Sequence, residues 1–174
     1  MDLKTVIRDV PDFPQPGILF RDITPVLERP DAFRAALDGL ADLISATAFD
    51  KIAALESRGF IFAAPLARQL GKPLIILRKP GKLPGRTVSV AYDLEYGSAA
   101  LEAHDDSLSA GDKVLIVDDL LATGGTAAAA QLLVTRLGAT VAAQLFLVEL
   151  EDLEGRSRLA GTPVFSLVKY SGDG

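Results

Sequence analysis

Apolar residues along the chain follow patterns that predict alternating strands and helices. Mostly apolar runs, typical of strands buried on both faces, occur at 51–55, 74–77, 114–117, 141–150 and 164–168, and those at 74–77 and 114–117 are continuous. Helices are expected in the segments between these runs, at 31–44, 60–70, 125–137 and 153–159. This alternation is typical of an α/β fold with a central, mainly parallel sheet flanked by helices.

Capping residues predict where these helices begin and end. Asp31 is expected to cap the start of the first helix, because its side chain can accept a hydrogen bond from a free backbone N–H. Gly71 and Gly138 are expected to end the second and third helices, since glycine adopts the left-handed conformation that a helix end often requires.

Two regions interrupt the alternation of strands and helices. The first thirty residues contain five prolines and predict an irregular lead-in that packs against the rest of the chain. Residues 78–86, RKPGKLPGR, predict a loop, because they hold two prolines, two glycines and four cations. The alternating segment 87–93 and a second strand through Leu101 and Ala103, joined at Gly97, predict an antiparallel hairpin. No repeat or second domain is evident, so residues 1–174 are expected to form one domain.

Composition excludes several classes of chemistry. The chain has no cysteine and a single histidine, His104, which excludes disulfides, thiolate metal sites and two-histidine metal sites. Its formal net charge of −5 argues against non-specific binding to nucleic acid or to an anionic membrane. The charged N-terminus lacks the apolar stretch of a signal peptide, and the longest uncharged run is too short to span a bilayer. We therefore expect a cytoplasmic protein.

Three predicted parallel strands end in polar clusters. These clusters are Glu56-Ser57-Arg58, Arg78-Lys79 and Asp118-Asp119. In open α/β sheets, ligands bind beyond the carboxyl ends of the strands, so the functional site is expected in these loops.

The strongest candidate motif is VLIVDDLLATGGT, residues 114–126. A buried strand leads through two carboxylates into a turn with hydroxyls and glycines that opens a helix, where free backbone N–H groups can bind a phosphate. Asp118 and Asp119 would repel a phosphate beside them, but a ribose between them and the phosphate would donate its hydroxyls to both. An ordinary strand-to-helix turn is the alternative for a bare TGG. No P-loop or dinucleotide fingerprint is present.

This motif resembles the phosphoribosyl-pyrophosphate (PRPP) motif of the type I phosphoribosyltransferases. Four further segments resemble adenine-specific members of that family, in order and at similar spacing: PDFPQPGILFRDITPVL (11–27), ESRGFIF (56–62), RKPGKLPG (78–85) and YDLEYG (92–97). The resemblance covers about residues 13–170. It implies the family's α/β fold with a small N-terminal hood (residues 1–30), a flexible flap made of a loop and a hairpin (residues 78–103), and a PRPP-binding motif (residues 114–126).

The resemblance also implies a reaction and the residues that carry it. PRPP and adenine would give AMP and pyrophosphate in the presence of Mg²⁺, which PRPP carries on its pyrophosphate without a direct protein ligand. Asp118 and Asp119 would bind the ribose, and the 5′-phosphate would lie on Ala122, Thr123, Gly124, Gly125 and Thr126. Pyrophosphate would be bound by Ser57, Arg58, Arg78, Lys79 and Lys82. Adenine would be bound by Leu19, Phe20, Arg21 and Leu120.

Two catalytic residues and a homodimer are also implied. Glu95 would act as the acid/base group near the purine, Arg78 would act on the departing pyrophosphate, and Tyr96 would belong to the mobile flap. The 78–86 loop would reach the neighbouring active site of a homodimer. This loop also supplies the local positive charge that an acidic protein needs in order to bind an anion as highly charged as PRPP.

Simpler structural explanations remain for some of these residues. Arg58 could form a surface salt bridge, Glu95 could be an exposed strand carboxylate, and Phe20 could be ordinary core. The 78–86 loop could be merely a solvated charged segment. Arg86 departs from the family pattern and His104 has no role in it, while Ala63 stands where glycine is expected, a change that concerns packing.

Two other functions remain as alternatives. The first is a phosphoribosyltransferase for another base, although the Phe20-Arg21 segment matches the adenine type. The second is a PRPP-sensing regulator without catalysis, for which we would expect a more basic chain or an added DNA-binding segment.

Overall fold

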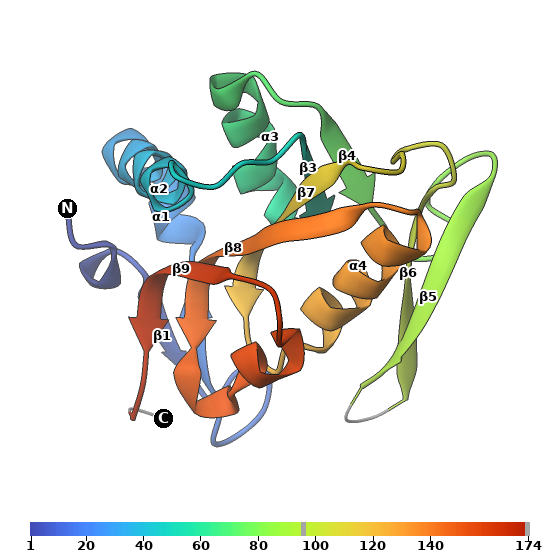
Figure 1. Ribbon diagram of the computed structural model, residues 1–174. Helices are drawn as coiled ribbons and strands as arrows, with labels where there is room; N and C mark the ends of the chain where they lie inside the picture. Colours follow the sequence, from blue (N-terminus) through green and yellow to red (C-terminus); the bar gives the residue numbers. More distant parts are fainter. Residues whose placement is uncertain (95–96, 173–174) are drawn as a thin grey trace.

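The computed structural model describes residues 1–94 and 97–172. Its centre is a parallel five-stranded sheet in the order β4-β3-β7-β8-β9 (Figure 1). These strands are β3 (Lys51–Leu55), β4 (Leu74–Leu77), β7 (Lys113–Leu121), β8 (Thr140–Leu150) and β9 (Val164–Tyr170). The main helices are α2 (Pro30–Leu43), α3 (Arg58–Leu70) and α4 (Gly125–Arg136). The predicted α/β class with a parallel sheet flanked by helices is therefore confirmed.

The central strands are mostly apolar because both of their faces are covered. Along β3, Ile52 and Ala54 pack in a cluster with α2 and α3, whereas Ala53 and Leu55 pack in a cluster with α4. The hairpin β5 (Thr87–Asp93) and β6 (Ser98–His104) joins the second cluster and lies outside α4 (Figure 1). The continuous apolar runs thus follow from the period of two that places successive side chains on opposite faces.

The lead-in contains more structure than the sequence suggested. A short 3₁₀ helix, η1 (Leu3–Thr5), precedes β1 (Arg8–Pro11), which pairs antiparallel with β2 (Leu19–Asp22). Helix α1 (Thr24–Glu28) then leads into α2. The expectation of an irregular segment was wrong because its prolines lie where they break no regular structure. Pro11, Pro14 and Pro16 lie at the end of β1 or between the paired strands. Pro25 and Pro30 lie in the first turns of α1 and α2, where a helix tolerates proline.

Three other boundaries differ from expectation. Arg29 caps α2 and Pro30 takes its first position, so Asp31 lies in the first turn. Strand β7 does not stop at Asp118 but continues to Leu121, because β8 pairs with it up to Glu149. The predicted helix at 153–159 is instead two 3₁₀ helices, η2 (Glu151–Leu153) and η3 (Gly155–Leu159).

The neighbouring strands β3 and β7 lead into helices on opposite faces of the sheet. Strand β3 is followed by α3, and β7 is followed by α4 on the other side (Figure 1). Such a reversal opens a crevice at the carboxyl ends of the strands, which is the usual binding place in this class of fold. None of the helices in the described part of the chain is long and apolar enough to span a membrane.

Candidate active site

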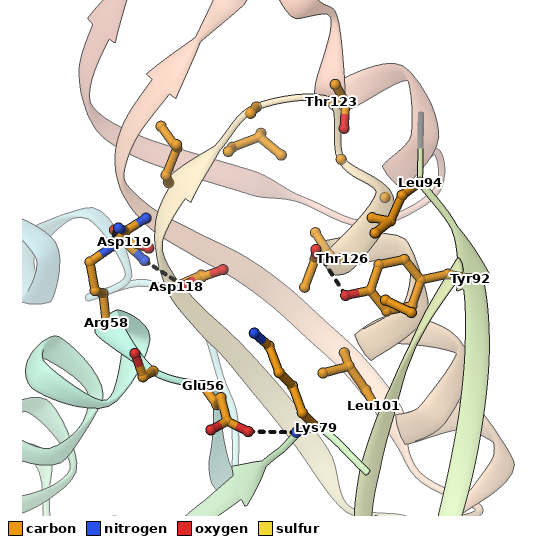
Figure 2. A pocket seen from close by; sticks show the side chains of 18 residues that line it. Glu56, Arg58, Lys79, Tyr92, Leu94, Leu101, Asp118, Asp119, Thr123 and Thr126 are labelled. Atoms are coloured by element: carbon orange, nitrogen blue, oxygen red, sulfur yellow. Dashed lines mark hydrogen bonds and ion pairs between the residues drawn. The ribbon is translucent and has the colours of Figure 1, made fainter. Parts of the chain in front are cut away.

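A cavity of about 520 Å³ lies at the carboxyl ends of β3, β4 and β7. Its walls include three polar groups that the sequence singled out at strand ends: Ser57 and Arg58, Lys79, and the Asp118-Asp119 pair. The residues from Leu120 to Ala127 continue the wall, and Tyr92, Leu94 and Leu101 close it from the hairpin (Figure 2). The crevice expected from the topology is therefore lined by most of the residues that the sequence nominated.

The turn between β7 and α4 is built to receive an anion. Gly124 has a φ of 84°, and α4 begins at Gly125 with no capping hydrogen bond from a described side chain. The first backbone N–H groups of the helix are thus left for a ligand, and the positive end of the helix dipole lies with them. Thr123 and Thr126 add hydroxyls, with Thr126 Oγ1 lying 3.4 Å from the Tyr92 hydroxyl.

The two aspartates differ in their partners. Asp119 is 6% exposed and accepts a hydrogen bond from Arg58 Nε at 2.5 Å. Asp118 accepts a hydrogen bond from the backbone N–H of Asp119 at 2.8 Å. Burial, and secondly the charge of Asp119, raise the pKa of Asp118 well above its ordinary value of 3.8. The pair therefore supplies carboxyl oxygens that can accept hydrogen bonds from hydroxyl groups.

Helix α3 approaches this pair closely through Gly59. A Cβ at this position would lie 2.9 Å from Asp118 Oδ1 and 3.0 Å from the carbonyl oxygen of Val117. Only glycine allows α3 to begin this close to the end of β7. The close approach brings Arg58, in the first turn of α3, to Asp119.

Glu56 was not assigned a role from the sequence, yet it organises the cationic side of the cavity. It accepts hydrogen bonds from Arg78 Nη2 at 2.9 Å and from the backbone N–H of Lys79 at 2.6 Å. Burial alone would raise the pKa of Glu56, but the hydrogen bonds from Lys79 and Arg78 outweigh it and lower the pKa. With Glu56 holding the loop, the Lys79 side chain points into the cavity (Figure 2).

The other cations of the 78–86 loop lie outside this cavity. Arg78 turns to Glu56, Lys82 is exposed, and Arg86 forms a surface ion pair with Asp105 at 2.7 Å. Neither described cavity wall at the strand ends includes them. Arg78 and Lys82 therefore do not line the cavity with Lys79, although Arg78 shares Glu56 with Lys79 and the charge of Lys82 helps to lower the pKa of Glu56.

A second, more apolar cavity of about 340 Å³ adjoins the first and contains the residues nominated for a purine. Leu19, Phe20 and Arg21 contribute from β2, and Leu120 from β7. Phe13 packs edge-on against Phe20 with ring centroids 5.1 Å apart. Arg58, Asp119 and Leu120 line both cavities and form their common wall.

Sequence reasoning missed several residues of these walls. Tyr92, Leu94 and Leu101 of the hairpin region, and Phe13, Ile18, Val148 and Leu150 of the apolar cavity, were not nominated. For Val148 and Leu150 no local signal exists, because they are apolar residues at the end of a buried strand. Tyr92 had a signal, since it lies in the YDLEYG segment.

The remaining residues considered in the sequence analysis lie outside the two cavities or outside the described part of the chain. Glu95 and Tyr96 lie outside the described residues. His104 ends β6, opposite Thr87 of β5, and lines neither cavity. Within residues 1–94 and 97–172, no group of three His, Cys, Asp or Glu side chains is arranged to hold a metal ion by itself.

Comparison with known proteins agrees with this geometry. A family model described as "Phosphoribosyl transferase domain" matches residues 26–158. An adenine phosphoribosyltransferase of Synechococcus sp. is 56% identical over 170 residues, covering 98% of this chain and 99% of the relative. The crystal structure of adenine phosphoribosyltransferase from Thermoanaerobacter pseudethanolicus superposes with a TM-score of 0.94 at 50% identity, covering 97% of this chain and 98% of that one.

A further solved relative contains ligands. The Saccharomyces cerevisiae adenine phosphoribosyltransferase, complexed with an imino-altritol bisphosphate and adenine, is 42% identical with a TM-score of 0.89. It covers 95% of this chain and 96% of its own.

The parallel sheet, the glycine-rich turn after β7 and the family match together define the chain as a member of the phosphoribosyltransferase family. Within that family it belongs with the adenine phosphoribosyltransferases, which it matches at 50–56% identity along nearly its whole length.

Proposed function

We propose that this chain transfers the 5-phosphoribosyl group of PRPP to adenine, releasing AMP and pyrophosphate. The observation that carries the proposal is the common wall of two cavities, one polar and one apolar. An apolar base lying on Leu120 and a ribose phosphate lying over Asp118 and the 122–126 turn would meet at this wall. The relatives named adenine phosphoribosyltransferase support the same reaction.

The chemistry assigns separate tasks to the two cavities. In the polar cavity, the α4 N-terminus would bind the 5′-phosphate and the aspartates would accept hydrogen bonds from the ribose hydroxyls. As the bond from C1′ to pyrophosphate breaks and the bond from C1′ to the purine N9 forms, positive charge develops on the ribose. The carboxylate charge that the Asp118–Asp119 pair retains would stabilise that positive charge.

The departing pyrophosphate would be received by the cationic side of the cavity. Lys79 points into the cavity, and Arg58 lies at the common wall. Mg²⁺ bound to the pyrophosphate would neutralise part of its charge, and the carboxylate and hydroxyl oxygens of this cavity are the ligand type that Mg²⁺ accepts. Glu95, which lies outside the described residues, would take the proton that N9 loses.

A homodimer would complete the cationic side. Lys82 is exposed and does not line the cavity of its own chain, and in the dimer it would reach the neighbouring subunit. We propose that Arg78 also reaches the neighbouring subunit, after its guanidinium leaves Glu56 and binds pyrophosphate. The expected location of the enzyme is the cytoplasm, where PRPP and free bases are available.

Nucleotide formation in variants of the aspartate pair tests the proposal. Purified protein, Mg²⁺, PRPP and adenine should give AMP, and Asp118→Ala/Asp119→Ala should lose it by a factor of about 10³ or more, because the ribose contacts and the stabilising charge vanish together. Asp105→Ala/Asp106→Ala removes an adjacent acidic pair outside the cavities and should retain activity. Equal activity in both variants would overturn the proposal.

A further inference from the structure

The phosphate-binding turn rests against another segment of backbone, and both sides of the contact are glycines. A Cβ on Gly124 would lie 2.5 Å from the carbonyl oxygen of Gly155, and a Cβ on Gly155 would overlap the carbonyl oxygen of Ala122. The first residue of η3 is therefore in direct backbone contact with the turn after β7. Any displacement of η3 would move Ala122 and Gly124.

The segment that carries Gly155 has little core of its own. Most residues from Asp152 to Ala160 are exposed, and η2 and η3 are short 3₁₀ helices of three and five residues. Leu159 is buried at 1% exposure and packs with Leu121, Ala127 and Phe146. One apolar anchor fixes the far end of η3, so a second contact is needed to fix Gly155.

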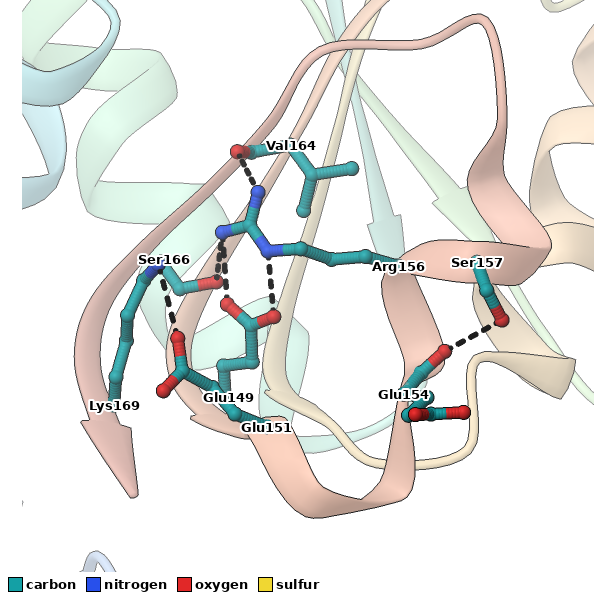
Figure 3. Close-up of polar contacts among 8 residues, drawn as sticks. All are labelled: Glu149, Glu151, Glu154, Arg156, Ser157, Val164, Ser166 and Lys169. Atoms are coloured by element: carbon teal, nitrogen blue, oxygen red, sulfur yellow. Dashed lines mark hydrogen bonds and ion pairs between the residues drawn. The ribbon is translucent and has the colours of Figure 1, made fainter. Parts of the chain in front are cut away.

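Arg156 supplies that contact, directly next to Gly155. Its Nε and Nη2 donate to the two carboxylate oxygens of Glu149 at 2.6 and 2.8 Å, and its Nη1 donates to the carbonyl oxygen of Val164 at 2.7 Å (Figure 3). Nη2 also lies 3.5 Å from Ser166 Oγ. Arg156 thus grips β8 and β9 at once.

The Glu149–Arg156 ion pair is held mainly by the burial of its carboxylate. The Glu149 side chain is 3% exposed and cannot exchange Arg156 for water, and its planar pairing fixes the direction of the guanidinium. Every guanidinium nitrogen of Arg156 has a protein partner, and Arg156 lines neither cavity. It is therefore a positioning residue and not a ligand-binding one.

We infer that the Glu149–Arg156 pair sets the shape of the 5′-phosphate site by pressing Gly155 against the Ala122–Gly124 turn. The inference rests on the proposed function to the extent that this turn binds the 5′-phosphate. The apolar cavity for the base does not include Gly155 or Arg156. A loosened pair should therefore weaken ligands that carry a 5′-phosphate and leave the free base unaffected.

Calorimetric binding of AMP and of adenine, measured without turnover, separates these effects. Glu149→Gln should raise the Kd of AMP about tenfold, and Gly155→Ala about a hundredfold, because a displacement of the order of 1 Å is costly in a preorganised site. The Kd of adenine should change less than about twofold in both variants. Glu151→Gln is the control, since it removes an exposed ion pair with Lys169 from the same segment (Figure 3) and should change neither Kd.

Two results would overturn the inference: an unchanged AMP Kd in Glu149→Gln, or an equal loss of AMP and adenine binding. Thermal melting checks that each variant is folded, and if Gly155→Ala does not fold, Glu149→Gln decides alone. Wild-type protein that binds AMP but forms none from PRPP and adenine would refute the proposed function. The inference about the Glu149–Arg156 pair would then still be decided by the Kd values for AMP and adenine.

Discussion

Asp118 is a carboxyl group in surroundings that disfavour its charge. Burial is the larger cause and the negative charge of Asp119 the second. Asp119→Asn should therefore lower the pKa of Asp118 towards 3.8 without reaching it, because burial remains. The Asp118 ¹³Cγ shift, followed by NMR as a function of pH, measures this. An unchanged or higher midpoint would contradict the assigned cause, and Asp106→Asn provides a control far from the pair.

His104 tests the completeness of the residue assignments. It ends β6 and lines neither cavity, so His104→Gln should keep kcat within about twofold of the wild-type value. Steady-state assays with saturating adenine and PRPP give the comparison. A hundredfold loss of kcat would show that His104 takes part in catalysis and that the assignment of catalytic residues is incomplete.

Phe20 of β2 lines the apolar cavity proposed to bind the base. Phe20→Ala should raise the KM for adenine about tenfold and leave the KM for PRPP nearly unchanged, since an aromatic face contributes roughly 1–2 kcal/mol to a bound ring. Phe165→Ala, in the partly buried shell of the main core cluster, is a matched control that should lower stability without changing the adenine KM. Parallel changes in both KM values would contradict the assignment of Phe20 to the base.

The ion pair between η3 and β8 links stability to pH. Burial opposes the charge of Glu149, but hydrogen bonds from Arg156 and Ser166 outweigh it and lower the pKa of Glu149 below its ordinary value of 4.5. A carboxyl group with a lowered pKa contributes stability above the unfolded pKa and loses it as the pH falls through the folded pKa.

Glu149→Gln should therefore cost stability at neutral pH and less in acid. At pH 7 the expected loss is about 2 kcal/mol in the free energy of unfolding, below the usual cost of a fully buried pair because Arg156 is 39% exposed. The difference from wild type should stay constant down to about pH 5 and shrink below 4.5. Urea unfolding at several pH values measures it, and a difference that grows in acid would contradict the sign.

The strands of the sheet could be predicted from sequence because burial on both faces requires a run of neighbouring apolar residues. Lys51–Leu55 and Leu74–Leu77 were placed at their observed bounds for that reason. The pairing of Arg8–Pro11 with Leu19–Asp22 requires no such run, since each strand is short and mostly part-exposed. The extension of β7 to Leu121 depends on β8, a partner that lies further along the chain.

The same limit applies to the candidate site. The glycine-rich turn and the aspartates were readable because their chemistry lies in consecutive residues. The role of Glu56 depends on two donors more than twenty residues away, and that of Gly155 on contact with a turn about thirty residues earlier. These contacts exist only once the sheet has brought its strand ends together.

In the proposed dimer, two variants with different defects should restore activity to each other, which two independent single chains could not do. Lys82→Ala leaves the aspartates intact, and Asp118→Ala/Asp119→Ala leaves Lys82 intact. If the 78–86 loop acts across the interface, mixing the two inactive proteins under exchange conditions should restore about a quarter of the wild-type sites, as random pairing in a twofold dimer requires. Each variant alone serves as the control, and no recovery after verified exchange would place Lys82 in its own chain's site.

Base selectivity is the most direct test that this chain transfers a phosphoribosyl group to adenine. Adenine, hypoxanthine, guanine, xanthine, uracil and orotate would each be mixed with the protein, Mg²⁺ and PRPP, and nucleotide formation followed by chromatography. AMP should form from adenine, and no nucleotide should form from the other bases. Nucleotide from another base with none from adenine, or none from any base while PRPP still binds, would contradict it.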